Sequence, residues 1–292
     1  MIYNLRHQTL YRYSQSVTFA RCVLRLTPRE TAAQSVLESH ISISPRPARS
    51  REHVGPFGER VITVAVEAPH TELVIEARSR VEVNRPPPFL PFDGLSWEDV
   101  REQAFASSAL GQEAPAHFLY PTPVAPVVPA ITAFGLESFA PGRSIIEAAS
   151  ELMGRIKREF VYDPEATAVS TPVGAAFAAR RGVCQDFTHI MIAALRGVGL
   201  PAAYVTGYLR TIPPPGKPRL EGADATHAWV WLWCGEAAGW IGFDPTNDLV
   251  VASDHIMLAV GRDSADTAPI DGVILGAGDQ KLKVAVDVIP AL

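Results

Sequence analysis

Three residues of the types that carry out nucleophilic acyl transfer follow one another along the chain: Cys184, His227 and Asp244. Cys184 opens an apolar helical pattern, and the free N–H groups and the dipole at a helix N-terminus favour a thiolate. The same N–H groups can hold an oxyanion, an imidazole can act as the base, and a carboxylate can fix its tautomer. These residue types in this order indicate an enzyme, although nothing in the sequence identifies a substrate.

The spacing of His227 and Asp244 predicts that their side chains share one face of a β-hairpin. Residues 226–233 and 240–243 are strand-like, with tryptophans on either side of the connecting loop. With a six-residue loop, His227 lies opposite Thr246 and Asp244 is its diagonal neighbour, whereas with a four-residue loop His227 faces Asp244 directly. Both registers leave the imidazole within reach of the carboxylate. Only a register shifted by one residue would place the two side chains on opposite faces.

Each candidate also has an ordinary structural role. A lone cysteine is most often a small buried side chain, and a lone strand histidine is most often a satisfied structural group. Cys22 and Cys234 have no adjacent base, so we expect them to be inert. Asp186 lies in the first helical turn, where an acidic residue ordinarily meets the helix dipole. His189, about one turn further on, is expected mainly to form a local hydrogen bond.

The second oxyanion donor stays open at this stage. Gln185, next to the cysteine, and Tyr162 are candidates, and both could equally be ordinary packing or solvent-facing residues. Trp229 is a candidate wall for an acyl pocket, but aromatic residues in strands more often build a core.

Composition excludes several other classes of function. The 292 residues are 47% hydrophobic and 20% charged, which suits one large or two modest globular domains. A net charge of −5 gives no basic face for nucleic acid and no polybasic membrane patch. The first seven residues carry charge early, so we expect neither a signal peptide nor a membrane helix. Three scattered cysteines favour a reduced cytoplasmic protein, and their spacing predicts no metal site and no cofactor.

The patterns divide the chain into three regions. Residues 1–84 alternate as short strands with turns between them and predict a small antiparallel β-sandwich, with runs at 3–13, 39–43, 61–66 and 73–83. A proline-rich stretch at 85–91 marks the boundary. Residues 85–143 are expected to form a linker and helical region, and residues 144–292 a catalytic core with C-terminal strands.

The second half of the chain predicts an α+β core. Ser96 can cap a helix, with Asp99 three residues on. Residues 144–160 carry an apolar stripe at helical spacing, as does the run that begins at Cys184 and ends near Gly199. Strand-like runs then follow at 203–210, 226–233 and 240–243. A helix followed by antiparallel strands is typical of α+β proteins.

Several strings of the sequence resemble the bacterial transglutaminase-like proteins. Three core strings carry the resemblance in order: 182–189 with 199–209, 224–229, and 239–247. Segments 254–263 and 272–276, and the opening with His7, Thr9, Tyr11 and Tyr13 followed by 24–28, extend it over nearly the whole chain. The resemblance implies a papain-like transglutaminase core, of the kind found in cysteine proteases, behind an N-terminal β-domain. It also implies that Cys184, His227 and Asp244 are nucleophile, base and orienting residue.

The chain departs from that family at four places. Trp231 stands where an acidic residue is usual, Ala203 replaces a common arginine, and Ser264 replaces an aromatic residue. Residues 54–59 replace the usual Asp-x-Phe-Gly-Asn of the front domain. None of these changes removes a member of the triad, so they bear on the substrate groove and on domain packing.

We therefore expect cysteine-dependent acyl transfer on an amide or peptide bond through a thioester. Hydrolysis is favoured slightly over transamidation, because the sequence has no sign of an acceptor groove or of a calcium loop of spaced acids. The alternatives are a protein-glutamine transamidase and a catalytically silent binding or assembly protein. An acyl-CoA transferase is disfavoured, because no phosphate-binding loop is found. The substrate and the oligomeric state stay open.

Overall fold

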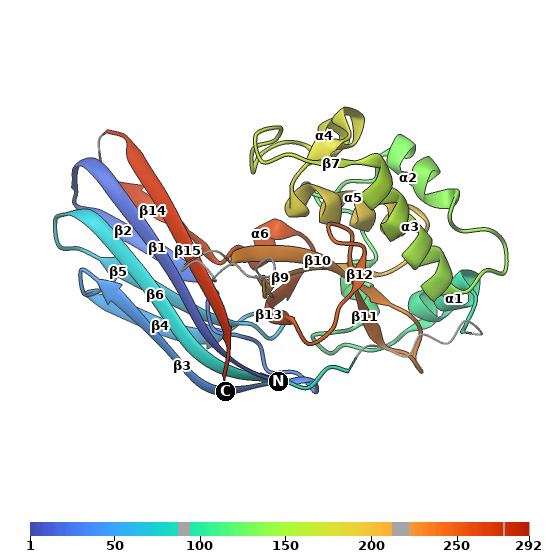
Figure 1. Ribbon diagram of the computed structural model, residues 1–292, viewed down its shortest axis with the longest axis horizontal. Helices are drawn as coiled ribbons and strands as arrows, with labels where there is room; N and C mark the ends of the chain where they lie inside the picture. Colours follow the sequence, from blue (N-terminus) through green and yellow to red (C-terminus); the bar gives the residue numbers. More distant parts are fainter. Residues whose placement is uncertain (87–93, 212–221, 223, 277, 292) are drawn as a thin grey trace, which may run out of the picture.

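Two antiparallel sheets form a sandwich on one side of the molecule (Figure 1). The computed structural model describes residues 1–86, 94–211, 222, 224–276 and 278–291, and within them each of these sheets has four strands. Their orders are β15-β1-β6-β3 and β14-β2-β5-β4. The strands are β1 (Ile2–Val17), β2 (Phe19–Leu24), β3 (Gln34–Ser44), β4 (Arg49–Val54), β5 (Arg60–Val66), β6 (His70–Val83), β14 (Ile270–Leu275) and β15 (Gln280–Pro290).

Alternation along the strands places apolar side chains between the two sheets. Leu73 and Ile75 of β6 are fully buried and pack in one cluster with Cys22 and Val64 of the opposite sheet. Successive residues of a strand face opposite sides, so this pattern buries one face of each sheet and leaves the other to solvent. Cys22 is therefore part of the sandwich interior.

The last two strands complete the sandwich rather than the core. β14 pairs with β2 and β15 pairs with β1, both antiparallel. The expectation that residues 144–292 form one core is therefore wrong for 270–290, because local patterns do not say which partner a distant strand finds. We propose a sandwich of 2–83 with 270–290 and a core of 97–261. The predicted boundary at 85–91 lies mostly outside the described residues.

A five-stranded antiparallel sheet forms the centre of the core within the described residues, in the order β12-β11-β10-β9-β13. Its strands are β9 (Ala202–Leu209), β10 (Ala225–Trp233), β11 (Trp240–Asp244), β12 (Leu249–Val250) and β13 (His255–Gly261). In Figure 1 it lies between the sandwich and a group of helices. Val81 and Val83 of β6 pack with Tyr208 and Ile256 of this sheet, which fixes the sandwich to the core.

The helices cover the face of the core sheet that points away from the sandwich (Figure 1). They are α1 (Trp97–Ala106), α2 (Pro129–Leu136), α3 (Ile145–Glu159), α4 (Val173–Ala179) and α5 (Cys184–Gly197). The short helix η1 (Pro115–Phe118) packs on the other face through Phe118, and α6 (Ser264–Thr267) lies at the sheet edge. A short parallel pair is formed by β7 (Val161–Tyr162) and β8 (Arg181–Gly182). Among the described residues, no helix is long and apolar enough to cross a membrane.

Helix α5 is central, because it is buried on all sides. Every residue from Asp186 to Arg196 is buried, between α2, α3 and α4 on one side and β10 on the other. The side chains of Ile190, Met191 and Leu195 are fully buried, and each such side chain contributes about 1.5–3 kcal/mol to folding. The position of the first residue of α5 is therefore fixed by the core.

The long amphipathic helices confirm the sequence-based predictions. α1 begins after Ser96, whose hydroxyl accepts a hydrogen bond from the Asp99 backbone N–H at 3.1 Å. α3 and α5 each begin within one residue of the predicted first residue. α2 and α4 were not predicted, because they are short and apolar on all sides and show no amphipathic pattern.

Candidate active site

The N-terminus of α5 is held in place by Asp186, in its first turn. The Asp186 carboxylate accepts hydrogen bonds from the Val183 backbone N–H at 2.8 Å and from the Thr167 hydroxyl at 2.7 Å. Gly182 leaves room for it, since a Cβ there would overlap the carboxylate. Asp186 thus caps the helix, and Cys184 stands as the first helical residue with its N–H free to point outward.

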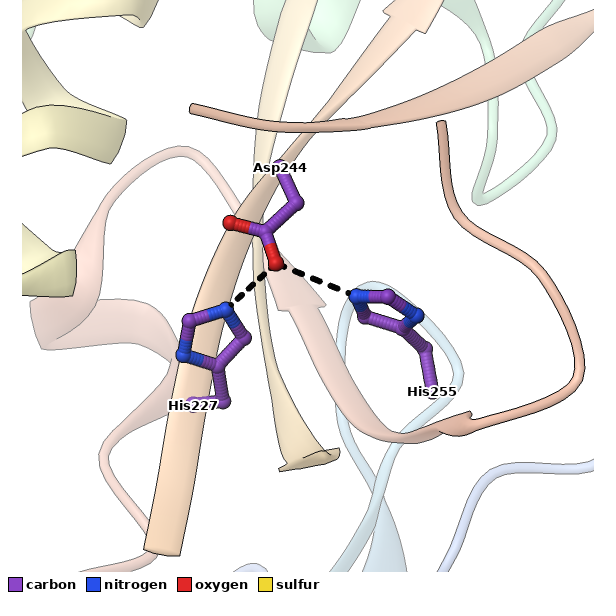
Figure 2. A group of neighbouring side chains, drawn as sticks. All are labelled: His227, Asp244 and His255. Carbon is purple, nitrogen blue, oxygen red and sulfur yellow. Dashed lines mark hydrogen bonds and ion pairs between the residues drawn. The ribbon is translucent and has the colours of Figure 1, made fainter. Parts of the chain in front are cut away.

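The hairpin of β10 and β11 brings His227 and Asp244 together. Trp233 pairs with Trp240 and Val230 with Phe243, which is the register of the six-residue loop. β11 ends at Asp244, and its Oδ2 lies 2.8 Å from His227 Nε2 (Figure 2). The prediction that the imidazole and the carboxylate share one face is confirmed.

Asp244 is fully buried, yet it is held as a carboxylate by five donors. Its Oδ2 accepts hydrogen bonds from His227 at 2.8 Å, Asn247 Nδ2 at 2.8 Å and His255 at 3.2 Å. Its Oδ1 accepts from the backbone N–H groups of Thr246 at 3.0 Å and Asn247 at 3.2 Å. Burial alone raises the pKa of Asp244, but these hydrogen bonds and the His227 charge outweigh it and hold the pKa well below its usual range.

His227 is nearly buried and carries its proton at neutral pH. Burial lowers the pKa of His227, but hydrogen bonds to Asp244 and Cys184, together with the charges of both, outweigh it and raise the pKa to about 10. Because Nε2 is bonded to Asp244, Nδ1 is the ring nitrogen left to meet the sulfur. The imidazolium thus lies beside the buried Asp244 carboxylate, on the side away from the cleft.

Cys184 and His227 both line a cleft of about 570 Å³. Its other walls come from β9 through Tyr204, from α6 through Ser264, and from β14 through Asp271. The sandwich therefore contributes to the cleft, through a strand that follows soon after the core in sequence. Cys184 is half-buried, which leaves its sulfur accessible from the cleft.

Comparisons with known proteins are consistent with this arrangement. Residues 3–82 match the family model described as the bacterial transglutaminase-like N-terminal region, and residues 135–245 match that of the transglutaminase-like superfamily. An uncharacterised protein of Mycobacterium tuberculosis is 37% identical, over 99% of this chain and 92% of the relative. The chain belongs to the transglutaminase-like superfamily.

A further relative and a solved structure are also similar to this chain. An uncharacterised protein of Mycobacterium leprae is 31% identical, over 97% of this chain and 96% of the relative. The crystal structure of a proposed cysteine protease from Cytophaga hutchinsonii has a TM-score of 0.75 and 20% identity, and covers 100% of this chain and 91% of that one. The shared fold confirms a transglutaminase-like α+β core with an N-terminal β-domain.

Two of the departures from the transglutaminase-like pattern lie opposite each other. Trp231 of β10 pairs with Ala203 of β9, so the expected acidic residue and arginine would have been cross-strand neighbours. Here a small side chain stands beside a large one, and the Trp231 ring packs against Trp240 with centroids 5.2 Å apart. An apolar pair thus occupies these two positions, on the face of the sheet away from α5.

The other predicted site residues of this transglutaminase-like chain take separate places. Gln185 lines the cleft, and its Nε2 donates to the Val169 carbonyl at 3.1 Å. Tyr162 is half exposed and lines a second cavity of about 260 Å³ on another side of His227. Trp229 is fully buried beneath His227 and is not among the residues that line the cleft.

His189 is held inside the core next to the cleft. Its Nε2 accepts the Ser264 backbone N–H at 3.3 Å, and its ring lies against Tyr204 with centroids 4.8 Å apart. Burial lowers the pKa of His189 to about 4, so the ring stays neutral. The expectation of a local hydrogen bond is therefore wrong, because the partner of His189 is Ser264 of α6, 75 residues further along the chain.

Sequence reasoning missed two residues that contact Asp244, namely Asn247 and His255. Asn247 follows the Asp-Pro-Thr turn, and a polar side chain three residues after a candidate catalytic acid was the available signal. His255 opens a strand that is buried throughout, where an isolated imidazole requires a partner. Neither signal says which atom the side chain reaches.

Among the described residues, one group of side chains has the composition of a metal site: His227, Asp244 and His255, with ligand atoms within 4.8 Å of one another. A metal ion requires a free nitrogen lone pair from each histidine. Here both Nε2 atoms lie at hydrogen-bond distance from a carboxylate oxygen, which can only accept, so both must carry protons. The arrangement fits a hydrogen-bonded set better than a metal centre.

Proposed function

We propose that this protein is a cysteine-dependent acyl-transfer enzyme that acts on an amide or peptide bond through a thioester. Cys184 is the nucleophile, His227 the acid and base, and Asp244 the residue that positions His227. The observation that carries the proposal is the order of the three groups: Cys184 and His227 line the same cleft, and Asp244 lies 2.8 Å behind the His227 ring. This is the order that thiol activation requires.

The first half of the reaction forms a thioester. The Cys184 thiolate attacks the carbonyl carbon, a C–S bond forms, and the carbonyl electrons move to oxygen. When the oxyanion collapses, the C–N bond breaks and the amine leaves with the proton from His227 Nδ1. Asp244 stays ionised throughout, because its donors remain in place.

The oxyanion needs at least one donor at the start of α5. The backbone N–H of Cys184 lies in the first helical turn, where it has no partner within the helix. Gln185 and Tyr162 remain the candidates for a second donor, since one lines the cleft and the other lies beside His227 in the adjoining cavity. Gln185 would first have to release the Val169 carbonyl.

Water is the proposed acceptor in the second half of the reaction. His227, now neutral, takes a proton from water, which attacks the thioester carbon, and the thiolate leaves as the C–S bond breaks. The half-buried position of Cys184 in an open cleft supports access of water to the thioester.

One observation favours a primary amine as the rival acceptor. Asp271 of β14 lies on the wall of the same cleft, and its exposed carboxylate suits an ammonium group. Bound there, an amine would compete with water for the thioester. The same three residues would then perform transamidation.

Mass spectrometry of the products distinguishes the two acceptors. We first screen peptide, amide and ester libraries with the purified protein and with Cys184→Ala as the control, and we repeat a positive reaction with a millimolar labelled primary amine. Hydrolysis predicts that the acid stays the main product and that little amine adduct forms. A dominant amide adduct would reverse this ranking and leave the roles of the three residues intact.

A catalytically silent binding protein gives a different result. Such a protein would turn over no member of the libraries, and its Cys184 would react with alkylating agents no faster than a free thiol.

The compartment we propose is the cytoplasm, on the evidence that Cys22, Cys184 and Cys234 are all unpaired.

A further inference from the structure

One oxygen of Asp244 is shared by three side-chain donors, of which Figure 2 shows the two histidines. Oδ2 lies 2.8 Å from His227 Nε2, 3.2 Å from His255 Nε2 and 2.8 Å from Asn247 Nδ2. With the two backbone donors on Oδ1, five donors address a group that offers about four lone-pair positions. The donors therefore compete, and each bond is weaker than it would be alone.

His255 can take part in this competition only as a neutral donor. It is 2% exposed, and its Nε2 faces an oxygen that can only accept, so the proton resides on Nε2. Its Nδ1 is buried without a hydrogen-bond partner among the described residues, so a second proton there would be an unpaired buried donor. The Trp229 ring meets it edge to face, with centroids 5.2 Å apart, and holds its orientation.

We infer that His255 is a positioning residue that shares Asp244 Oδ2 with His227 and thereby limits how firmly Asp244 binds the protonated His227 ring. The inference rests on the proposed role of His227 as acid and base. His227 must release its proton to the leaving amine and later take one from the acceptor. An acid that binds its proton too firmly is slow in the first of these steps. A second imidazole on the same oxygen reduces that hold without adding charge.

Other ionisable groups face the two histidines, and each is the same in all the variants that the experiment compares. The ionisable residues around His227 line the cleft and the second cavity, and they are Lys157, Tyr162, Cys184, Tyr204 and Asp271. The Arg85 guanidinium donates to the His255 carbonyl at 3.0 Å, and Asp254 precedes His255 in the chain. Of all these, Cys184 is the one in direct contact with His227, so it is removed in the experiment.

The experiment compares His255→Phe and His255→Gln in a full-length Cys184→Ala background. Phenylalanine keeps a ring against Trp229 but has no N–H, whereas glutamine can still present an N–H to Oδ2. The His227 ring is titrated by NMR in chains labelled with ¹³C-histidine, and its resonance is assigned by its loss in His227→Gln. Circular dichroism checks that each variant is folded.

We expect His255→Phe to raise the midpoint of the His227 titration by about one pH unit, a tenfold gain in proton affinity, because one competing hydrogen bond to a charged group is removed. His255→Gln should leave the midpoint close to that of the parent. A purely structural role would loosen the bond between His227 and Asp244 and lower the midpoint. An unchanged or lowered midpoint in folded His255→Phe would therefore overturn the inference.

Two further arms test the reactivity of Cys184 and the presence of a metal ion separately from the sharing of Oδ2. Alkylation of Cys184 in the unmodified chain tests the proposed function alone. The NMR titration tests the sharing of Oδ2 alone, because its result does not depend on whether the cysteine is reactive. Repeating the titration with EDTA tests the cluster as a metal site. A midpoint that moves when EDTA is added would show a bound cation and would also overturn the inference, and an unmoved midpoint supports it.

Discussion

Replacing His227 by glutamine is expected to reduce turnover more than any other single change outside Cys184 itself. The imidazole supports the thiolate, protonates the leaving amine and activates the acceptor, so its loss affects every step. In serine triads such losses reach roughly 10⁶-fold, and a thiolate needs less help, so we expect roughly 10³- to 10⁵-fold here. Steady-state rates on any substrate found by the screen measure it, with the exposed His53→Gln as the matched control.

The same variant carries a pH-dependent signature. The pKa of His227 is raised to about 10 from its ordinary value of 6.5, so its protonated ring stabilises the fold fully below about pH 6.5. That contribution is lost as the pH rises through about 10. The melting temperature of the wild type should therefore fall toward that of His227→Gln over this range. A difference between the two proteins that stays constant from pH 6.5 to 10 would contradict the buried imidazolium.

Asp244→Asn is expected to keep the fold and to reduce turnover by up to roughly 10⁴-fold. An amide can still accept the backbone N–H groups of Thr246 and Asn247 at Oδ1, so the turn after β11 is retained. At the position of Oδ2, the asparagine lacks the negative charge that stabilises the His227 imidazolium, and its amide can favour the wrong tautomer of the ring. Asp99→Asn, on the exposed first turn of α1, is the control. Unchanged rates with an unchanged circular dichroism spectrum would remove Asp244 from the mechanism.

The sequence was sufficient for the parts of the site that depend on local patterns. The apolar period after Cys184 predicted α5 and its first residue, because the helix is long and the residues that begin and end it are recognisable in the sequence. The tryptophans on either side of the β10–β11 loop limited the register to two choices, with a loop of six or of four residues. Both choices place His227 near Asp244. Strand period and loop length decided these points without any long-range information.

The parts that the sequence could not predict depend on distant partners. β14 and β15 pair with strands near the start of the chain, and their own alternation does not identify those partners. Asp271 therefore reaches the cleft by a route that no local pattern reveals. His255 likewise meets Asp244 although β13 and β11 are not neighbours in the core sheet, and no local pattern reveals that contact.

The central claim is that Cys184 is the nucleophile and that His227 activates it, and brief alkylation with iodoacetamide at pH 6 tests this claim most directly. Burial raises the pKa of the Cys22 and Cys234 thiols, and both residues are buried, so they should label slowly. We predict by peptide mapping that Cys184 reacts far faster than either, and about tenfold faster than glutathione at the same pH. Equal labelling of the three cysteines, or a Cys184 rate no higher than that of glutathione, would contradict the account.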